Sequence, residues 1–365
     1  MIPTVALRRV SVRAVRNLAS VELEPAPRLN VISGDNGQGK TSLLEAIYLV
    51  ATTRSFRAER TVEVLQTGRD RATVIALVAE GAQVREQRAV VGPRVTSYLV
   101  DGQRPERLAR FATLTPVVVF HPGDLRLVTG PAALRRTLLD RVALFHEPTS
   151  GDHRRRYLHA LRERQRALEQ RGPTAGDVSA YEDLAATEGA LLAAARARAA
   201  SRLAEALAPA FARMAPQDLQ LTTAYRPGGT TDVDQFRATL AARRAADLRR
   251  RTPTYGPQRD DLDLALDGRS ARTQASQGQQ RLLTLALKLA ELATVTAARG
   301  AQPILLLDDV SSELDPTRTG AVYEFLRGTA GQVFVTTTRP ELFATPGITP
   351  SDRVDWRLRD GSLEG

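Results

Sequence analysis

At residues 34–41 the chain reads Gly34-Asp35-Asn36-Gly37-Gln38-Gly39-Lys40-Thr41, and this stretch decides its fold. It follows the β-rich run 29–33. The apolar residues after it recur at intervals of three and four, which predicts a helix over residues 41–50. In a strand, loop and helix of this kind, glycines let backbone amides surround a phosphate, the lysine reaches the β- and γ-phosphates, and the threonine hydroxyl binds magnesium. We therefore expect residues 34–41, together with Ser42, to bind a nucleoside triphosphate.

A second segment ends an apolar strand with two acids. Residues 304–307 are all isoleucine or leucine, and Asp308 and Asp309 follow them. A magnesium site needs a carboxylate at the end of a buried strand, so we expect Asp308 to hold the metal. Asp309 would orient or deprotonate the attacking water, and Lys40 would assist at the γ-phosphate. Paired acids also occur in ordinary loops, and only the glycine-rich stretch favours the catalytic interpretation here.

A third segment, Ser276-Gln277-Gly278-Gln279-Gln280-Arg281, opens a predicted helix. The free amides and positive dipole at such a helix start suit a terminal phosphate, which would contact Ser276, Gly278 and Gln279. Since residues 34–41 already supply one phosphate site, two copies packed head to tail would let this second site close over the γ-phosphate held by the partner copy. The simpler alternative is that Ser276 only caps the helix.

The composition limits the class of protein. With 365 residues, of which 42% are hydrophobic, the chain is long enough for two lobes. It has no cysteine, which excludes disulfides and thiolate metal sites and fits a reducing compartment. It shows neither a secretory signal nor an uncharged apolar run of about 18 residues. We therefore expect a cytoplasmic protein without a membrane span.

The charge favours a polyanionic partner. The formal net charge is +10, and clustered arginines displace counterions from a phosphate backbone, so nucleic acid is the first candidate. The alternative is that the basic residues are solvated helix faces. The candidate DNA contacts form three clusters: Arg54 and Arg57; Arg154, Arg155 and Arg156; and Arg249, Arg250 and Arg251.

The order of the predicted elements indicates an α/β fold with a split head. Strand-like runs come first, at residues 7–15, 29–33, 74–79, 87–91, 96–100 and 115–120. Residues 132–251 are rich in Ala, Leu, Arg and Glu and predict four or five helices. Strand-like runs return at residues 262–266, 304–307, 332–336 and 354–358. We predict a head with a mixed sheet from residues 1–121 and 252–365, and an inserted α-helical lobe from residues 122–251.

Together these segments resemble the ABC-type ATPase heads of the SMC-like branch, and within it the RecF family of DNA-repair proteins. The resemblance covers nearly the whole chain. It rests on residues 33–41, on Phe120-His121-Pro122-Gly123-Asp124-Leu125 with Arg135, Arg136 and Asp140, on Tyr255-Gly256-Pro257-Gln258-Arg259-Asp260-Asp261, and on residues 276–281 with 287–291. No heptad pattern persists between Lys40 and Ser276, which excludes the long coiled coil of SMC proteins.

The resemblance implies ATP and magnesium as ligands and an ATP-dependent homodimer, in which ATP binding and hydrolysis would act as a switch. Ser276 to Gln280 would be the signature motif acting in trans, and residues 311–315, which include Asp315, would be the D-loop touching the partner subunit. It also implies duplex DNA near single-strand gaps, a RecR partner and help in loading RecA. Gln66 is our candidate for the glutamine that senses magnesium.

Three features depart from the family pattern. Gln258 stands where the family usually has histidine, and Asp309 stands where many ABC heads have glutamate. Threonines at 336–338 follow the strand-like run 333–335, where ABC heads often place a switch histidine. With a shorter carboxylate and no imidazole nearby, we expect slow ATP turnover.

Two other functions are compatible with parts of this pattern. An ATPase subunit of a membrane transporter would carry the same nucleotide-binding segments, although the helical insertion and the basic charge argue against it. A non-catalytic structural DNA binder could retain the nucleotide-binding fold without hydrolysis.

Overall fold

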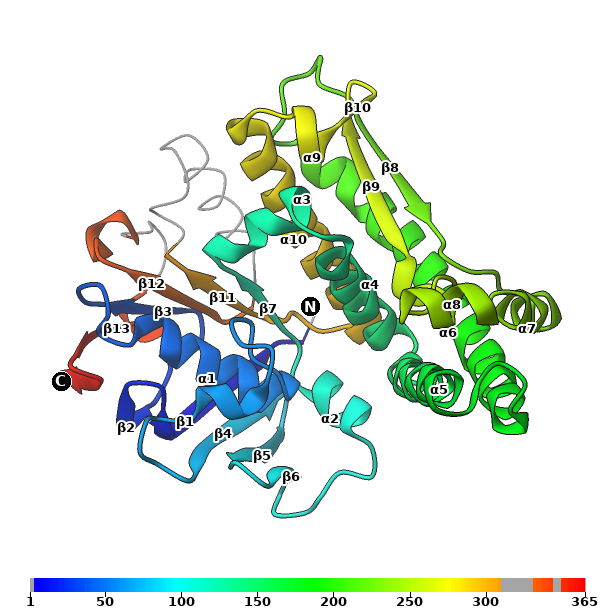
Figure 1. Cartoon of the computed structure of the whole chain (residues 1–365). Coiled ribbons are helices and arrows are strands. Elements are labelled where there is room, and N and C mark those ends of the chain that lie inside the picture. The colour runs from blue at the N-terminus through cyan, green and yellow to red at the C-terminus, as the bar shows by residue number, and fades with distance from the viewer. Residues whose placement is uncertain (1–2, 310–330, 344–348, 365) are drawn as a thin grey trace. The chain divides into compact units, whose positions relative to one another are not determined.

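The chain forms two compact units in the computed structural model, which describes residues 3–309, 331–343 and 349–364. Unit 1 comprises Met1–Asp124 and Val295–Gly365, and unit 2 comprises Leu125–Thr294 (Figure 1). The first boundary lies close to the predicted one. The second boundary differs, because residues 252–294 belong to unit 2 and not to the head. The helical insertion therefore carries with it the segment that opens with Ser276.

The first sheet of unit 1 has six strands in the order β14-β13-β3-β12-β11-β7. The strands are β3 (Leu29–Ser33), β7 (Val117–Phe120), β11 (Ile304–Asp308), β12 (Val333–Thr337), β13 (Arg353–Arg359) and β14 (Ser362–Glu364). All neighbours are parallel except β13 and β14, which confirms the mixed sheet. The carboxyl ends of β3, β12, β11 and β7 therefore lie along one edge, where ligands bind in sheets of this kind.

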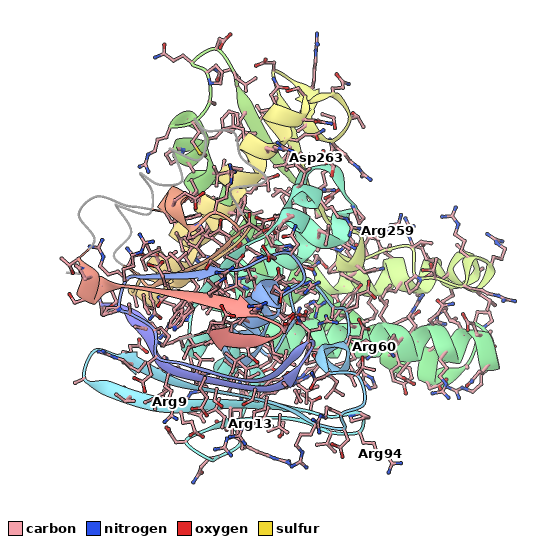
Figure 2. All side chains as sticks on the ribbon, turned by 90° about the vertical axis from the view of Figure 1, so that its left-hand side faces the viewer. Arg9, Arg13, Arg60, Arg94, Arg259 and Asp263 are labelled. Carbon is pink, nitrogen blue, oxygen red and sulfur yellow. The ribbon has the colours of Figure 1, made fainter. Side chains whose placement is uncertain are left out.

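The second sheet of unit 1 is antiparallel, in the order β2-β1-β4-β5-β6. Its strands are β1 (Val5–Val15), β2 (Leu18–Leu23), β4 (Ala72–Glu80), β5 (Gln83–Val91) and β6 (Thr96–Val100). In β1 the valines at 10, 12 and 15 are buried, whereas Arg9 and Arg13 are exposed (Figure 2). This alternation is what a sheet with one face on the core requires.

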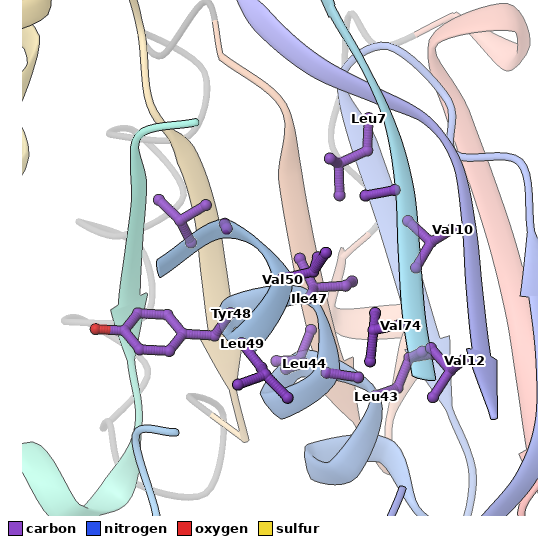
Figure 3. Packing of buried hydrophobic residues seen from close by; sticks show 14 of the residues in the cluster. Leu7, Val10, Val12, Leu43, Leu44, Ile47, Tyr48, Leu49, Val50 and Val74 are labelled. Carbon is purple, nitrogen blue, oxygen red and sulfur yellow. The ribbon is translucent and has the colours of Figure 1, made fainter. Parts of the chain in front are cut away.

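Helix α1 (Lys40–Thr52) contacts strands of both sheets. Every residue of α1 except Thr41 is buried, and its apolar side chains pack with those of β1 and β4 (Figure 3). A helix that is covered on all sides is held in one position, so the loop before it is fixed as well. Among the described residues of unit 1, the other helical segments are η1 (Thr61–Val64), α2 (Leu108–Leu114), η4 (Pro340–Phe343), η5 (Pro350–Asp352), most of η2 (Pro122–Leu125) and the end of α10 (Gln277–Arg299).

Unit 2 combines helices with a small antiparallel sheet. Its helices are α3 (Arg126–Thr129), α4 (Ala132–His146), α5 (Ser150–Arg171), α6 (Gly176–Ala212), α7 (Val233–Ala242), α8 (Arg244–Arg250), η3 (Pro257–Arg259), α9 (Ala271–Gln274) and most of α10 (Gln277–Arg299). Its strands are β8 (Leu221–Arg226), β9 (Asp261–Leu266) and β10 (Arg269–Ser270), in the order β10-β9-β8. Leu262, Leu264 and Leu266 share one core with Leu139 and Leu283. This shared core explains why residues 252–294 join the helices.

A buried network of charges connects the segments of unit 2 that resemble the family blocks. Arg196 donates to Asp140 Oδ1 at 2.6 Å and to Asp260 Oδ2 at 2.9 Å. Arg135 donates to Asp261 Oδ1 at 2.7 Å. Removing one partner of such a network leaves an uncompensated buried charge, which costs about 3–5 kcal/mol. These acids and arginines therefore hold α4, α6 and the start of β9 together.

Gln258, the residue that departs from the family pattern, is bonded at both ends of its amide. The hydroxyl of Tyr157 donates to Gln258 Oε1, and Gln258 Nε2 donates to the carbonyl of Tyr255 at 2.8 Å. The side chain thus serves as donor and acceptor inside unit 2. A neutral histidine likewise offers one donor and one acceptor.

Candidate nucleotide-binding site

The loop at residues 34–39 has a backbone that only glycine fits at its two ends. Gly34 has φ 144°, and a Cβ there would lie 2.4 Å from the carbonyl oxygen of Leu358. Gly39 has φ 109°, and a Cβ there would lie 2.7 Å from Leu18 Cδ2. Both positions combine a left-handed backbone with close packing. The loop is therefore built into unit 1 between β3 and α1, as the sequence predicts.

Lys40 points back into this loop. Its Nζ donates to the carbonyls of Gly34 and Asp35 at 2.6 and 2.7 Å, and the residue is 8% exposed. Burial lowers the pKa of the Lys40 ammonium, and the carboxylates of Asp309, Asp308 and Asp35 oppose this change. The ammonium is thus held inside the curve of the loop backbone, where a bound phosphate would compensate its buried charge.

Asn17 holds the loop from outside, a role that the sequence did not reveal. Its Nδ2 donates to the carbonyl of Gly37 at 2.9 Å, and its Oδ1 accepts from Ser42 Oγ at 2.9 Å. The carbonyl of Gln38 accepts from the amide of Gly361 at 3.2 Å. A single asparagine between two strands has the signature of a turn residue, so the sequence gives no signal of this contact.

Asp308 lies at the carboxyl end of β11, beside the loop. Its Oδ1 accepts from Thr41 Oγ1 and from Thr336 Oγ1, each at 2.8 Å, and the residue is 5% exposed. Burial raises the pKa of the Asp308 carboxyl, while the two hydroxyls and the charges of His121 and Arg57 oppose the rise. The structure therefore brings together Thr41 and Asp308, the pair of oxygen ligands predicted for magnesium.

Asp309 follows in a left-handed conformation with φ 48°. Its backbone amide donates to Thr336 Oγ1 at 3.0 Å. One threonine hydroxyl, at the end of β12, therefore bonds to both acids. Thr336 stands where a switch histidine was sought in the sequence, and it organises the acids instead. Aspartate tolerates this backbone better than most residues, since its short polar side chain bonds locally.

His121 corrects the expectation that no imidazole lies near the acids. It follows β7, whose Phe120 pairs with Leu307 of β11, so it lies near Asp308, and a protonated ring there would lower the pKa of that carboxyl. The ring is held by the amide of Gly123, which donates to Nδ1 at 3.1 Å, and by Phe56, whose ring centroid is 5.0 Å away. The sequence places this histidine in a block that resembles the family. It does not show that the histidine lies next to β11, which is distant in the chain.

The arginines near α1 surround a buried carboxylate, Glu45, that the sequence did not single out. Glu45 is fully buried and accepts from Arg16 Nε and Nη2, each at 2.9 Å, and from Ser55 Oγ. Arg57, a predicted DNA contact, lies 3.8 Å from Glu45 and also acts on the pKa of Asp308. Arg54, the other predicted contact here, is exposed. Arg57 therefore lies near the candidate nucleotide site.

Two further predictions concern Gln66 and residues 311–315. Gln66 follows η1, and its backbone N–H donates to the carbonyl of Ala14 at 3.0 Å, next to the end of β1. Its role as a magnesium sensor stays a prediction. Residues 311–315, including Asp315, lie outside the described residues.

Unit 2 presents the segment 276–281 at the start of α10. Gln279 N donates to Ser276 Oγ at 3.2 Å, and Ser276 N donates to Gln279 Oε1 at 2.9 Å. This reciprocal pair is a capping box, so Ser276 does cap the helix. By helix geometry, the amides of the first turn, including that of Gly278, still lack intrahelical acceptors. The cap and a phosphate-binding role are therefore compatible.

The remaining predicted DNA contacts divide into two kinds. Arg154, Arg155 and Arg156 of α5 each lie within 4 Å of a carboxylate, namely those of Asp140, Asp152 and Glu188. Arg249, Arg250 and Arg251 are exposed at the end of α8. Their contact with DNA stays a prediction for both clusters.

Comparison with known proteins gives three consistent results. The family model described as the RecF/RecN/SMC N terminal domain matches residues 6–346. The DNA replication and repair protein RecF of Anaeromyxobacter sp. (strain Fw109-5) is 39% identical, with 98% of each chain covered. The same protein of Myxococcus xanthus is 37% identical, with 91% of this chain and 90% of the relative covered.

Solved structures agree with the sequence relatives. The structure of the recombination mediator protein RecF-ATPrS in the RecFOR pathway has a TM-score of 0.85 at 25% identity and covers 99% of this chain and 98% of its own. The Smc head domain from Pyrococcus furiosus, at 14% identity and a TM-score of 0.57, shares the fold alone. The resemblance drawn from the motifs and the predicted ATPase-head fold are thus confirmed.

The comparisons give the transporter alternative no support. In the part of the chain that the structure describes, we also find no helix with the length and apolar character that crossing a bilayer requires.

Proposed function

Because the chain belongs to the RecF family of DNA replication and repair proteins, we propose that it is an ATP-controlled DNA-binding protein of recombinational repair. In this proposal ATP joins two copies into a dimer, the dimer clamps duplex or gapped DNA, and slow hydrolysis releases it. The family name supports the role in repair. The observation that carries the switch is the division of the phosphate-binding groups, with one set in unit 1 and a different set in unit 2.

The first half of the proposed site lies in unit 1. Residues 34–42 would surround the triphosphate, with Lys40 at the β- and γ-phosphates. Thr41 and Asp308 fit a magnesium ion, since both offer oxygen atoms. The carboxylate of Asp308 is held in place by hydrogen bonds from the hydroxyls of Thr41 and Thr336. A bound magnesium ion would neutralise charge on the triphosphate. Asp309 would accept the proton of the attacking water or orient that water.

The second half would come from the partner copy. Ser276, Gly278 and Gln279 of one copy would close over the γ-phosphate bound to the other, and Asp315 would contact the partner as well. The first turn of α10 supports this, because its amides carry the positive end of a long helix. ATP that contacts both copies stabilises the dimer by mass action.

The partners and the place of action follow from the family. We propose that the protein works in the cytoplasm, meets DNA near single-strand gaps, binds RecR and helps to load RecA. The relative of known structure is described as a recombination mediator in the RecFOR pathway, which supports this assignment. Arg54 stays a proposed DNA contact, whereas Arg57 would serve the nucleotide site. Arg57 lies near Asp308, so it would contact the nucleotide before it contacts a phosphate backbone.

Static light scattering tests the dimer. With the mass of one chain at 39.7 kDa, we expect a single copy without nucleotide and with ADP, and about twice that mass with magnesium and ATP. A second arm measures phosphate release with and without duplex DNA at low salt. A mass that is the same under all three nucleotide conditions would overturn the switch. Phosphate release that DNA leaves unchanged, together with no retention of DNA, would overturn the proposed DNA role.

A further inference from the structure

The arginines of helix α5 differ in whether a carboxylate already neutralises them. Arg154 Nε lies 2.8 Å from Asp140, Arg155 Nη2 lies 2.9 Å from Asp152, and Arg156 Nη1 lies 3.2 Å from Glu188. A guanidinium bound to a carboxylate adds little net positive charge to the surface. These three residues therefore attract phosphate less than their cluster in the sequence suggests.

Two arginines further along the same helix have no such partner. Arg162 and Arg166 are exposed, and no carboxylate among the described residues lies within 4 Å of either. They are four positions apart, so they lie on one face of α5, about 6 Å apart along the axis. Their charge is available to an external anion.

The end of helix α8 adds three more exposed arginines to this region of unit 2. Leu248 packs against a buried cluster that includes Ala167 and Leu168 of α5, and Gln165 Nε2 donates to the carbonyl of Asp247 at 3.4 Å. Residues 249–251, all arginine, follow directly and are exposed. No ion pair joins them to a carboxylate among the described residues. The five arginines thus come from two helices that are in contact.

Few acids remain to offset this charge. Asp247 is fully buried and is bound to Arg164 at 2.7 Å, so it does not face the surface. Glu163 and Glu169 are the carboxylates on this stretch of α5, and Glu169 accepts from Gln165 at 2.8 Å. Five arginines therefore face two carboxylates, and the region keeps an excess of positive charge.

We propose that Arg162, Arg166 and residues 249–251 form a basic surface, the α5–α8 surface, that binds the phosphate backbone of duplex DNA. Exposed guanidiniums spaced along one helix match a line of phosphates, and contacts to phosphates carry no information about base sequence. The inference rests on the proposed function for the identity of the anion. It replaces Arg154, Arg155 and Arg156 as contacts and assigns Arg162 and Arg166, which the sequence did not single out.

The test compares unpaired and paired arginines of one helix in the full chain. The first variant is Arg162→Gln/Arg166→Gln, and the second is Arg249→Gln/Arg250→Gln. The matched control is Arg155→Gln/Arg156→Gln, which removes the same formal charge from arginines that already have partners. Fluorescence anisotropy with a labelled duplex of random sequence, over a series of salt concentrations with ATP and magnesium, gives the affinity and its salt slope.

We expect each surface variant to lower the salt slope by about 2, since each phosphate contact contributes about 0.9. Binding at low salt should weaken by about 10-fold or more, and the control should stay within about 2-fold of the wild type. ATP affinity, measured separately, should be unchanged in all three variants, which excludes misfolding.

The outcomes separate this inference from the proposed function. If the wild type itself retains no DNA, the proposed function fails. If the wild type binds DNA but both surface variants keep its slope, the α5–α8 surface is wrong and the anion binds elsewhere. An equal loss in the control and the surface variants would also overturn the inference, because it would show a response to total charge alone. Loss confined to the surface variants supports it.

Discussion

The two halves of the proposed ATP site differ in how complete they are within one chain. In unit 1, Lys40 is buried and bonded to two loop carbonyls, and Asp308 accepts from two threonine hydroxyls. In unit 2, Ser276 is exposed, and its hydroxyl takes part in a capping box with Gln279. The first half is preorganised for a triphosphate. The second half is stable without a bound triphosphate, because the capping box closes within one copy. It would therefore be preformed when another copy presents its nucleotide.

This difference gives the switch its physical basis. A preorganised half lets a single copy bind nucleotide first, because little ordering remains to be done. The start of α10 is stable while it is exposed in a single copy, since the capping box stabilises this end of the helix by about 1 kcal/mol. Association then depends on the nucleotide held in unit 1. The following variants separate the two halves, from the largest expected effect to the smallest.

Asp309→Asn should stop the chemistry while leaving the first half intact. Asparagine also tolerates the left-handed backbone at this position, where φ is 48°. It cannot accept a proton from water, so we expect ATP hydrolysis to fall by about 10²–10³-fold. Phosphate release under single-turnover conditions measures the loss, and ATP binding should stay within about 2-fold. Hydrolysis that persists within about 10-fold would remove Asp309 from its role. Phosphate release by the wild type that is lost in the variant would exclude the structural DNA binder that does not hydrolyse ATP.

Lys40→Met should weaken ATP binding by about 100-fold, because charge-assisted bonds to phosphate contribute about 1.5–3 kcal/mol. Isothermal titration with ATP and magnesium measures this. Arg94→Met is the matched control, since Arg94 is an exposed cation of unit 1 (Figure 2). ATP affinity in the Lys40 variant that equals that of the control would show that the loop is not the phosphate site.

The sequence alone predicted those parts of the unit 1 nucleotide site whose residues are neighbours in the chain. The strand, glycine loop and helix at residues 29–52 follow from local periodicity and from the φ angles that glycine allows. Asp308 follows in the same way, because a short apolar run before an acid indicates the end of a buried strand. Each of these predictions needed only neighbouring residues.

The parts that the sequence missed depend on the order of strands in the sheet. Thr336 and His121 reach Asp308 because β12 and β7 flank β11, and no local pattern announces that order. Asn17 has the same origin, since it meets the loop through the strands on either side of it. Strand β8 was also missed, because it is a short run with no regular alternation of apolar and polar residues, and it lies within an otherwise helical region. Residues 252–294 were assigned to the head for a related reason, as their leucines pack with helices far away in sequence.

Ser276→Arg should separate the two halves most directly. The added side chain places bulk and charge at the first turn of α10, where the partner's γ-phosphate would approach. We expect ATP binding by the single copy to stay within about 2-fold, while the rise in mass with ATP is lost in light scattering. Ser270→Arg, at the exposed start of α9, is the control and should dimerise normally. Dimerisation of the Ser276 variant with ATP would refute the assignment in trans.

His121→Ala should have the smallest effect, and it tests whether the imidazole contributes to the first half. The ring is held by Gly123 and Phe56 at the end of β7, the strand beside β11. Nδ1 accepts a hydrogen bond from Gly123, so the ring is neutral in this arrangement. Its removal takes away that bond and the packing on Phe56, which loosens the end of β7 beside Asp308 by about 1 kcal/mol. We expect about a 3–5-fold higher magnesium concentration for half-maximal hydrolysis, with the ATP affinity unchanged. His159→Ala, which removes an exposed imidazole of α5 in unit 2, is the control. An identical magnesium requirement in both variants would show that His121 only shapes the turn after β7, and that Thr41 and Thr336 suffice to keep Asp308 ready for the metal.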